Sequence, residues 1–442
     1  MVAMVRLRSS LPAALAVVAV LAMPARAYVP EDTPPRRAEA AARAMLAEEP
    51  ARGTIPGVVV MRGGRMLWSL NADTALVPAS IMKLATTTTG MVRFGPEHRF
   101  PTRVLATRVG DTVQTLTIVG GGDPTFATEA YRRKRFLPKP SDEIKIPAFA
   151  SGSPTVEQLA ARVRDAGVRR VTGDLIADES LFDTERTQPG WLASYLDDDP
   201  DVSLLSALTI NEGRAGADRD RVVPNPARAA AGALRAALAD LGITVAGTVR
   251  VGRAPEGSKE IARVESPPLA EIVDFINRYS VNYPAELLLK SLGTAFRDRG
   301  TTAAGVEVVR ETLADLGVGI DGFEMTDGSG LSVLNRMTPR TIAGILHAIL
   351  TRRGPGWEEL RASLPAAGGP GTLLHRMADP PTAGNLRGKT GQIRRVRGMV
   401  GWVTASDGVP LIYVAIFNEA PSPFALTSPL DLFGLLLARF PR

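Results

Sequence analysis

Residues 78–84 read PASIMKL, where a serine and a lysine stand three positions apart and a helix-like stretch follows from Ile81. Positions i and i+3 lie on one face of a helix, so the Lys83 amine can reach the Ser80 hydroxyl. A serine is a poor nucleophile until an adjacent base takes its proton, and burial can lower the pKa of a lysine from ~10.4 toward neutrality. Ser80 is therefore a candidate nucleophile with Lys83 as its base. Alone, the pair is more typical of a helix start with a solvated lysine.

Two further motifs favour the catalytic interpretation of Ser80 and Lys83 over a plain helix start. Ser280-Val281-Asn282 fits S-x-N, and Lys389-Thr390-Gly391 fits K-T-G. The chain has seven lysines and a single S-x-x-K, so two of the seven lysines stand in the required positions. The combination resembles the signature of class A β-lactamases and penicillin-binding proteins, which use a serine nucleophile.

Each of these residues has an expected role. Ser280 would relay a proton between Lys83 and the leaving group, and Asn282 would hydrogen-bond Lys83 or the substrate amide. Lys389 and Thr390 would bind the terminal carboxylate of a peptide, because selection for a free carboxylate requires a cation. Lys389 would also supply a neighbouring charge that lowers the pKa of Lys83.

The two ends of the chain predict one shared sheet. Gly63-Gly64 between two apolar runs is a hairpin signature, and an apolar helix is expected at 430–440. The strand-like runs lie at 57–61, 65–70, 386–391, 396–404 and 410–418. We expect an α+β fold, in which a five-stranded antiparallel sheet is flanked by helices, as in the serine β-lactamase/penicillin-binding (DD-peptidase) fold.

The middle of the chain has a different character. Short β-like runs alternate with long loops over residues 99–265, which predicts a large, mainly β inserted region. Residues 28–98 and 266–442 would then form the two parts of a penicillin-binding (transpeptidase-like) domain. Within the insertion, residues 128–154 hold a basic cluster and several prolines, and we expect an exposed excursion there.

Residues 1–27 have the pattern of a secretory signal peptide. Arg6 and Arg8 precede an apolar stretch, and Ala25-Arg26-Ala27 is a small-x-small cleavage site. The apolar run is shorter than the ~20 residues that span a bilayer. The sequence therefore predicts a protein exported across the cytoplasmic membrane, to the periplasm or the extracellular cell wall.

Composition excludes several kinds of site. The chain has no cysteine, which removes disulfides, thiol nucleophiles and thiolate metal sites, and its three histidines have no metal-ligand spacing. We expect neither a metal nor another cofactor. The net charge of +6 falls to +3 without the three arginines of residues 1–27, so nothing points to nucleic acid as a partner.

Four further stretches extend the resemblance over nearly the whole chain beyond the signal segment. They are GGGDPT at 120–125, GDL at 173–175, SAL at 206–208 and DGSGLS at 327–332. Together with the 200 positions between Ser80 and Ser280, they resemble peptidase family S13, the class C low-molecular-mass group of penicillin-binding protein 4 type. The resemblance implies a serine D-Ala-D-Ala carboxypeptidase/endopeptidase that acts on peptidoglycan stem peptides, with β-lactams as covalent inhibitors. We interpret the four stretches as family markers and not as catalytic residues, and those at 120–125 and 327–332 are locally turns.

One position departs from the family pattern. The residue after K-T-G is usually Ser or Thr, and here it is Gln392. Its backbone N–H would still form the oxyanion hole with that of Ser80, but the lost hydroxyl would weaken recognition of the substrate carboxylate. Arg394, Arg395 and Arg397 follow and would either compensate or be solvated.

Two other functions remain open on these residues. A β-lactamase would need a base that holds a deacylating water, and Glu286, beside the S-x-N motif, is better explained as part of its helix. A catalytically weak wall-binding protein on the same fold is kept open by Gln392. The motifs do not separate carboxypeptidase from endopeptidase activity, and they carry no information on oligomeric state.

Overall fold

The computed structural model describes residues 33–440 except 110–111, 137–148, 198–200 and 216–220, so the expected signal segment lies outside the described residues. The helices are α1 (Pro34–Ala47), α2 (Lys83–Phe94), α3 (Glu129–Arg135), α4 (Val156–Asp165), α5 (Pro226–Asp240), α6 (Leu269–Tyr279), α7 (Tyr283–Arg297), α8 (Thr302–Asp315), α9 (Pro339–Thr351), α10 (Trp357–Ser363) and α11 (Thr427–Ala438). The strands are β1 (Ile55–Arg62), β2 (Arg65–Leu70), β3 (Pro101–Val109), β4 (Thr112–Val119), β5 (Arg170–Val171), β6 (Leu175–Asp178), β7 (Thr244–Val245), β8 (Val249–Val251), β9 (Lys259–Glu265), β10 (Arg387–Ile393), β11 (Val396–Thr404) and β12 (Pro410–Asn418).

The two chain ends form one five-stranded antiparallel sheet, as predicted. Its strand order is β10-β11-β12-β1-β2, so the late strand β12 pairs with the early strand β1. The β1–β2 hairpin turns at Gly63 and Gly64, whose φ values of 54° and 78° lie in the region that glycine adopts without steric cost. Although β1 and β12 lie far apart in the sequence, their pairing joins the two chain ends in a single sheet.

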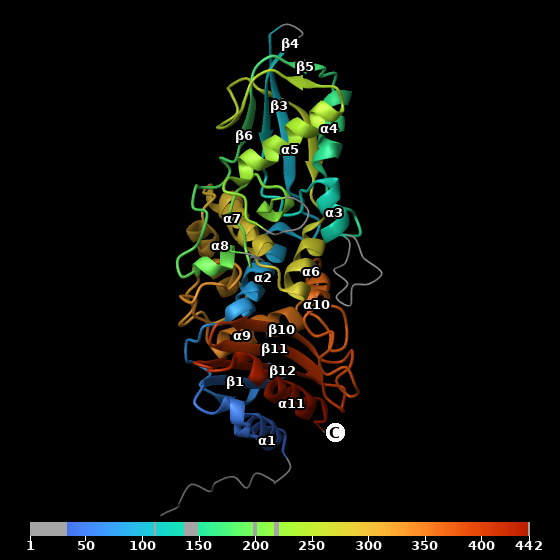
Figure 1. Ribbon diagram of the computed structural model, residues 1–442. Helices are drawn as coiled ribbons and strands as arrows, with labels where there is room; N and C mark the ends of the chain where they lie inside the picture. Colours follow the sequence, from blue (N-terminus) through green and yellow to red (C-terminus); the bar gives the residue numbers. More distant parts are fainter. Residues whose placement is uncertain (1–32, 110–111, 137–148, 198–200, 216–220, 441–442) are drawn as a thin grey trace, which may run out of the picture.

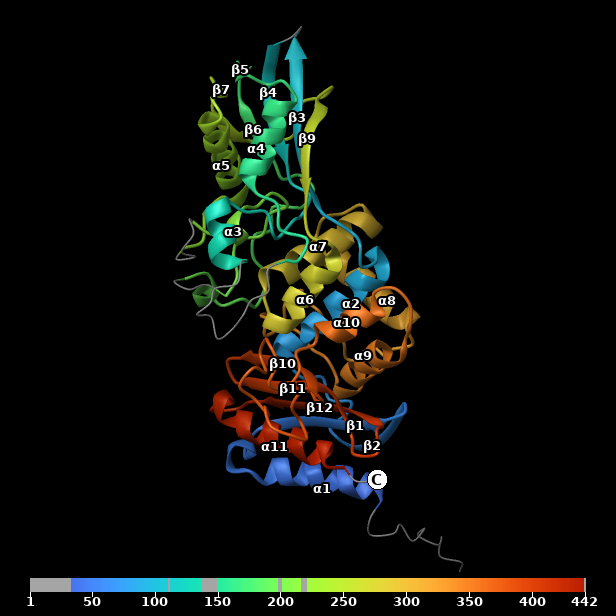
Figure 2. The same cartoon turned by 90° about the vertical axis from the view of Figure 1, so that its right-hand side faces the viewer.

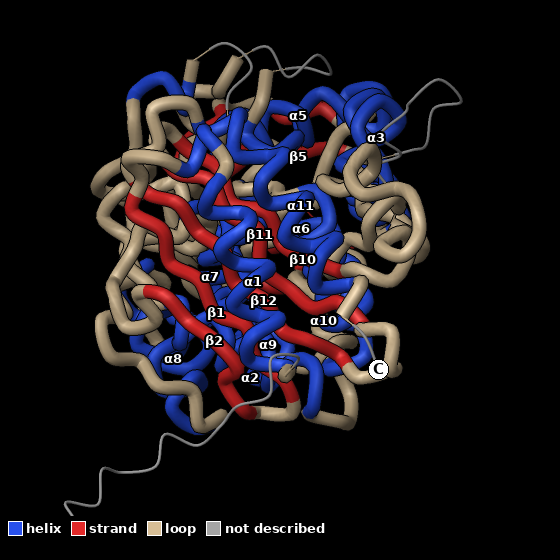
Figure 3. Tube along the Cα trace, turned by 90° about the horizontal axis from the view of Figure 1, so that it is seen from below, coloured by secondary structure: helices blue, strands red, loops and turns tan. Residues whose placement is uncertain are grey.

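Both faces of this sheet are covered. Tyr413 and Val414 are consecutive residues of β12 that point to opposite faces. Tyr413 packs against Phe433 of α11 on the side that also carries α1, and Val414 belongs to the core formed with α2, α6, α7, α8 and α9. Figure 3 shows α1 and α11 lying across the outer face. Burial on both sides explains why β11 and β12 are almost continuously apolar.

A second sheet lies at the far end of the molecule (Figures 1 and 2). Its order is β7-β5-β4-β3-β9, and β6 pairs with β4 and β8. β3 pairs antiparallel with β4 and β9, whereas β5, β6, β7 and β8 join in parallel pairs, and α4 and α5 supply the core. Pro101 pairs with Glu265, so the chain leaves and returns at neighbouring points. We call residues 101–265 the second-sheet region.

The expected exposed excursion at 128–154 is wrong for the residues that flank its centre. Tyr131, Phe136 and Phe149 are buried in an aromatic cluster against Phe275 of α6. Arg135 is buried as well, because its guanidinium forms an ion pair with Glu212 and stacks over the Phe275 ring. Of the basic run, Arg135 is thus held in the core by a carboxylate 77 positions away, whereas Arg133 and Lys134 are exposed. Residues 137–148 of the excursion lie outside the described residues.

Candidate active site

The PASIMKL segment forms a tight turn that leads into a helix. A short 3₁₀ helix, η2, spans Ala79–Met82 and contains Ser80, and α2 begins at Lys83. The expectation of a helix that begins at the serine is therefore right in outline, with one 3₁₀ turn in place of the first α turn. This tighter turn still brings Lys83 Nζ to 2.9 Å from Ser80 Oγ.

Lys83 is fully buried and its amine has three partners. Nζ lies 2.7 Å from Asn282 Oδ1 and 2.7 Å from the Ser329 carbonyl oxygen, in addition to Ser80 Oγ. A carbonyl oxygen can only accept, whereas a hydroxyl can also donate. In the neutral amine, the two hydrogens go to Asn282 and Ser329, and the lone pair faces Ser80 Oγ. This geometry equips Lys83 to take a proton from Ser80.

The electrostatics favour that neutral amine near physiological pH. Burial lowers the pKa of Lys83 to about 7, although the negative charges of Asp327, Glu286 and Asp201 act in the opposite direction. A base whose pKa lies near the working pH is well matched to proton transfer. Removal from water, not the second lysine, is thus the main cause of the lowered pKa of Lys83.

The S-x-N and K-T-G motifs meet on the other side of Ser80. α6 ends at Tyr279, and Ser280 adopts a left-handed conformation with φ 60° that turns the chain into α7. Lys389 Nζ donates to Ser280 Oγ at 2.7 Å and to the Thr390 carbonyl oxygen at 2.9 Å. Lys389 is fully buried, and desolvation followed by repulsion from Lys83 lowers the pKa of its amine well below the ordinary value.

Strand β10 lies directly against the Ser80 turn. A Cβ on Gly391 would stand 2.8 Å from the Pro78 carbonyl oxygen and 3.0 Å from Ile81 Cδ1, so glycine permits this close approach. Thr390 and Gln392, two positions apart on β10, share the half-buried face of the strand. Strand β10, which carries the K-T-G residues, therefore lies directly beside Ser80.

A cavity of about 500 Å³ joins these elements. Ser80, Ser280, Asn282 and Gln392 line it, and Lys83 and Lys389 lie beneath its floor. Its other lining residues are Leu192, Tyr195, Asp201, Leu331, Ile393, Arg394, Arg395, Pro421, Pro423 and Phe424. The lining thus combines polar and charged groups with apolar side chains, as ligand-binding clefts do.

The three arginines after Gln392 have different surroundings. Arg395 forms an ion pair with Glu419, and its Nε lies 3.0 Å from the carboxylate. Arg397 is buried, donates to Thr427 Oγ1 and stacks near the Phe424 ring. Arg394 is exposed on the cavity wall. Of the three, Arg394 is the arginine best placed to meet an anionic substrate.

Two backbone carbonyl groups and the contacts of Glu286 in the site were not predicted from the sequence. The Ser329 and Asp201 carbonyl oxygens hold Lys83 and Asn282, and a carbonyl carries no sequence signal because every residue has one. Glu286 accepts hydrogen bonds from the backbone N–H groups of Gly328 and Ser329, and burial raises its pKa to about 8. The DGSGLS stretch that contains Ser329 was identified in the sequence as a family marker and a turn, without a role in the site.

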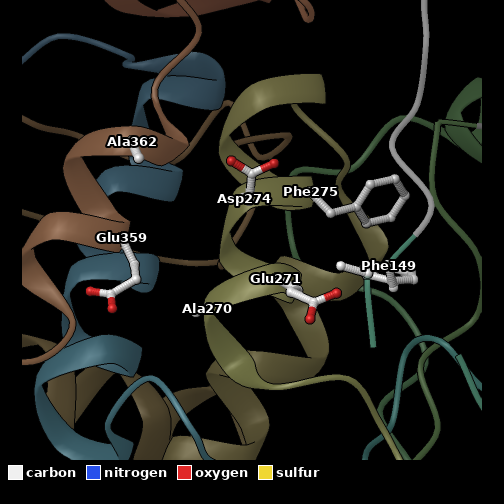
Figure 4. Close-up of a pocket in the computed structure, with 8 residues that line it drawn as sticks. Phe149, Ala270, Glu271, Asp274, Phe275, Glu359 and Ala362 are labelled. Carbon is white, nitrogen blue, oxygen red and sulfur yellow. The ribbon is translucent and has the colours of Figure 1, made fainter. Parts of the chain in front are cut away.

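A second cavity of about 320 Å³ lies between α6 and α10, away from the three motifs (Figure 4). Phe149 and Phe275 form its apolar wall. Two of its carboxylates already have partners, since Glu271 accepts from the Ser151 backbone and Asp274 pairs with Arg278. It adds no group to the Ser80 site.

Two kinds of feature are absent from the described residues. No cluster of three or more His, Asp or Glu side chains in this part of the chain has the arrangement of a metal site. Within the same residues, every helix is too short or too polar to cross a bilayer.

The chain is similar to known carboxypeptidases in sequence and to a penicillin binding protein in structure. The chain is 30% identical over 396 residues to carboxypeptidase Rv3627c of Mycobacterium tuberculosis, covering 88% of this chain and 81% of that protein. It is 29% identical to the D-alanyl-D-alanine carboxypeptidase of Actinomadura sp. strain R39, covering 89% and 83%. The structure of penicillin binding protein 4 from Haemophilus influenzae superposes with a TM-score of 0.73 at 20% identity, covering 90% and 97% of the two chains.

The family assignment rests on the sequence match, and the structural likeness supports the fold. A model of the D-Ala-D-Ala carboxypeptidase 3 (S13) family matches residues 39–221 and 215–434, which together span most of the chain. The expected α+β penicillin-binding fold with its five-stranded sheet is confirmed. The chain belongs to the D-Ala-D-Ala carboxypeptidase 3 (S13) family of peptidases.

Proposed function

We propose that this peptidase is a serine D-Ala-D-Ala carboxypeptidase/endopeptidase that forms an acyl-enzyme on Ser80. The observation that carries the proposal is the set of three contacts around Lys83 Nζ, which leaves its lone pair for the Ser80 hydroxyl. The substrate is a peptidoglycan stem peptide that ends in D-Ala-D-Ala or is cross-linked through D-Ala. Related proteins named as D-Ala-D-Ala carboxypeptidases support this substrate class.

The reaction begins with proton transfer from Ser80 to Lys83. Ser80 Oγ then attacks the carbonyl carbon of the penultimate D-Ala, and the carbonyl oxygen becomes an oxyanion. The backbone N–H groups of Ser80 and Gln392 stabilise that charge, as the close packing of β10 on the Ser80 turn favours. A substitution of Gln for Ser or Thr leaves this backbone donor in place.

Collapse of the intermediate requires a proton on the leaving amine. Ser280, which accepts a hydrogen bond from Lys389 Nζ, supplies it from its own hydroxyl and recovers the proton that Lys83 took from Ser80, so Lys83 returns to its neutral form. The C–N bond breaks, D-Ala or the cross-linking amine leaves, and an ester to Ser80 remains. Water then hydrolyses the ester, with Lys83 again as the base.

Residues on strand β10 and directly after it recognise the substrate carboxylate. Lys389 is buried beneath Ser280 and Thr390, so its charge acts on the carboxylate through these two residues and not from an open position. An arriving anion raises the pKa of the Lys389 amine and favours its charged form. Thr390 and Arg394 make the direct contacts.

A β-lactamase is less well supported. Glu286, the acid beside the S-x-N motif, is buried and bound to the Gly328 and Ser329 amides, and it does not line the cavity. A β-lactam would therefore acylate Ser80 and remain as a slowly hydrolysed ester. The structure of Haemophilus influenzae penicillin binding protein 4 in complex with a β-lactam is consistent with such inhibition.

We further propose that the chain is exported. The support is the Arg6 and Arg8 n-region, the apolar stretch and the Ala25-Arg26-Ala27 cleavage pattern. Export would bring the enzyme to peptidoglycan, in the periplasm or the outer cell wall.

The test is acylation by benzylpenicillin, followed by intact mass and peptide mapping. We expect a persistent adduct on the Ser80 peptide of the wild type, none on Ser80→Ala, and an unchanged adduct on Ser180→Ala, an exposed serine after β6. D-Ala release from a D-Ala-D-Ala pentapeptide and cleavage of cross-linked muropeptides then separate the two peptidase activities. Intact penicillin with no adduct would favour the wall-binding protein, and rapid penicilloate release would favour the β-lactamase.

A further inference from the structure

The DGSGLS loop contacts Lys83 through one peptide unit. The carbonyl oxygen of the Ser329–Gly330 peptide accepts from Lys83 Nζ at 2.7 Å, and the N–H of the same peptide donates to Asp327 Oδ1 at 2.8 Å. An amide whose N–H is bound to a carboxylate is polarised, and its oxygen becomes a better acceptor. Asp327 is thus connected to Lys83 by a peptide that also sets the direction of one amine hydrogen.

Asp327 is itself held from several directions. It is fully buried and accepts from Ser332 N at 2.6 Å and from Asn335 Nδ2 at 2.7 Å. A further donor comes from outside the loop, because Trp191 Nε1 donates to Asp327 Oδ2 at 2.8 Å. Trp191 belongs to the second-sheet region, 136 positions earlier in the chain.

The loop is pressed against the Ser80 turn. Gly330 has φ 86°, and a Cβ there would lie 1.9 Å from the Ala79 carbonyl oxygen and 3.0 Å from Ser80 N. A displacement of the loop would therefore change the positions of both Ser80 and Lys83.

The other acceptor of Lys83 has a similar support. Asn282 Oδ1 accepts from Lys83, while Asn282 Nδ2 donates to the Asp201 carbonyl oxygen at 2.9 Å, which fixes which end of the amide faces the lysine. Asp201 also belongs to the second-sheet region. The same region therefore orients both carbonyl groups that bind the Lys83 amine.

We propose that Trp191 and Asp327 are positioning residues for Lys83, and that the second-sheet region takes part in catalysis by directing the Lys83 lone pair at Ser80. The inference rests on the proposed function, since it assumes that Lys83 is the base for Ser80. Neither residue touches the substrate; both act through the Ser329–Gly330 peptide.

The charge of Asp327 adds a second, separable effect. Among the charges that oppose the burial of Lys83, Asp327 raises the pKa of the amine the most. Removal of that charge would lower the pKa of Lys83 further. The acidic limb of the pH profile for acylation would then move to lower pH, which damage to packing alone would not cause.

The first test compares Trp191→Phe with Trp357→Phe, a control in α10 outside the site. Trp191→Phe keeps the ring packing and removes the N–H, and a hydrogen bond to a charged group is worth enough that we expect penicilloylation to slow roughly tenfold. Trp357→Phe should acylate at the wild-type rate, with thermal melting reporting stability for both. Equal acylation of Trp191→Phe and wild type would overturn the proposal.

The second test is Asp327→Asn, with the acylation rate measured against pH. We expect a lower maximal rate together with a shift of the acidic limb to lower pH. A lower rate with an unmoved limb would mean a structural role only and would overturn the positioning role. If Asp327→Asn does not fold, Trp191→Phe decides alone. Failure of the wild type to form a Ser80 adduct would instead refute the proposed function.

Discussion

Lys389 Nζ donates a hydrogen bond to Ser280 Oγ across 2.7 Å, although the two residues lie 109 positions apart. The contact joins the first residue of the α6–α7 turn to the strand beside the Ser80 turn. It also places a buried amine of lowered pKa next to a hydroxyl that faces the cavity. Ser280 and Lys389 therefore act as one unit.

Ser280→Ala should slow acylation while leaving a folded protein. The substitution removes the hydroxyl that delivers a proton to the leaving group, and general acid–base groups typically contribute roughly 10²- to 10⁴-fold. It also leaves a Lys389 N–H without its partner. The measurement is the second-order rate of penicilloylation, with melting temperature as the stability readout. Ser363→Ala, a buried serine of α10, is the control; if both variants lost acylation equally, Ser280 would have no special role.

Acylation should depend on pH through Lys83. Its pKa is lowered to about 7, and only the neutral amine can accept the Ser80 proton, so the rate should rise as pH increases through that value and then level off. Below it, the neutral fraction falls by about tenfold per pH unit. Stopped reactions with benzylpenicillin across this range give the profile, and circular dichroism at each pH excludes unfolding. A rate that fell with rising pH would exclude Lys83 as the base.

Gly391→Ala should impair the site more than it impairs the fold. The new Cβ would meet the Pro78 carbonyl oxygen at 2.8 Å and push β10 away from the Ser80 turn. Overpacking costs typically ~1–3 kcal/mol, roughly five- to hundredfold in rate if it falls on the acylation transition state. The comparison is Gly232→Ala in α5, where a Cβ meets no atom within 4 Å. Wild-type acylation by Gly391→Ala would contradict the close packing of β10.

Gln392→Thr should strengthen selection for a free carboxylate. It restores the hydroxyl that the family usually carries at this position, and a hydrogen bond to a charged group is worth ~1.5–3 kcal/mol. We expect kcat/KM for a peptide with a free D-Ala-D-Ala end to rise about tenfold relative to its C-terminal amide. Gln114→Thr, on an exposed position of β4, controls for the same substitution elsewhere. An unchanged ratio would mean that Thr390 and Arg394 already provide the recognition.

The sequence by itself determined the local parts of this protein. The i, i+3 spacing of Ser80 and Lys83 placed their side chains together, because one helical turn separates them whether the turn is 3₁₀ or α. The glycine pair at 63–64 determined the first hairpin, and the apolar runs at both chain ends predicted the five-stranded sheet. The three motifs, the 200 positions between Ser80 and Ser280 and the four further stretches predicted the family, which the comparisons confirm.

Tertiary structure alone decided how these parts are supported. The basic run at 132–135 became partly buried because Glu212 neutralises Arg135, and no local pattern marks a partner 77 positions away. Ser329 and Asp201 hold the Lys83 network through backbone carbonyl groups, which every residue possesses. Trp191 reaches Asp327 from the second-sheet region. Proximity within one turn follows from chain geometry, whereas these long-range contacts exist only after the core has packed and brought distant segments to hydrogen-bonding distance.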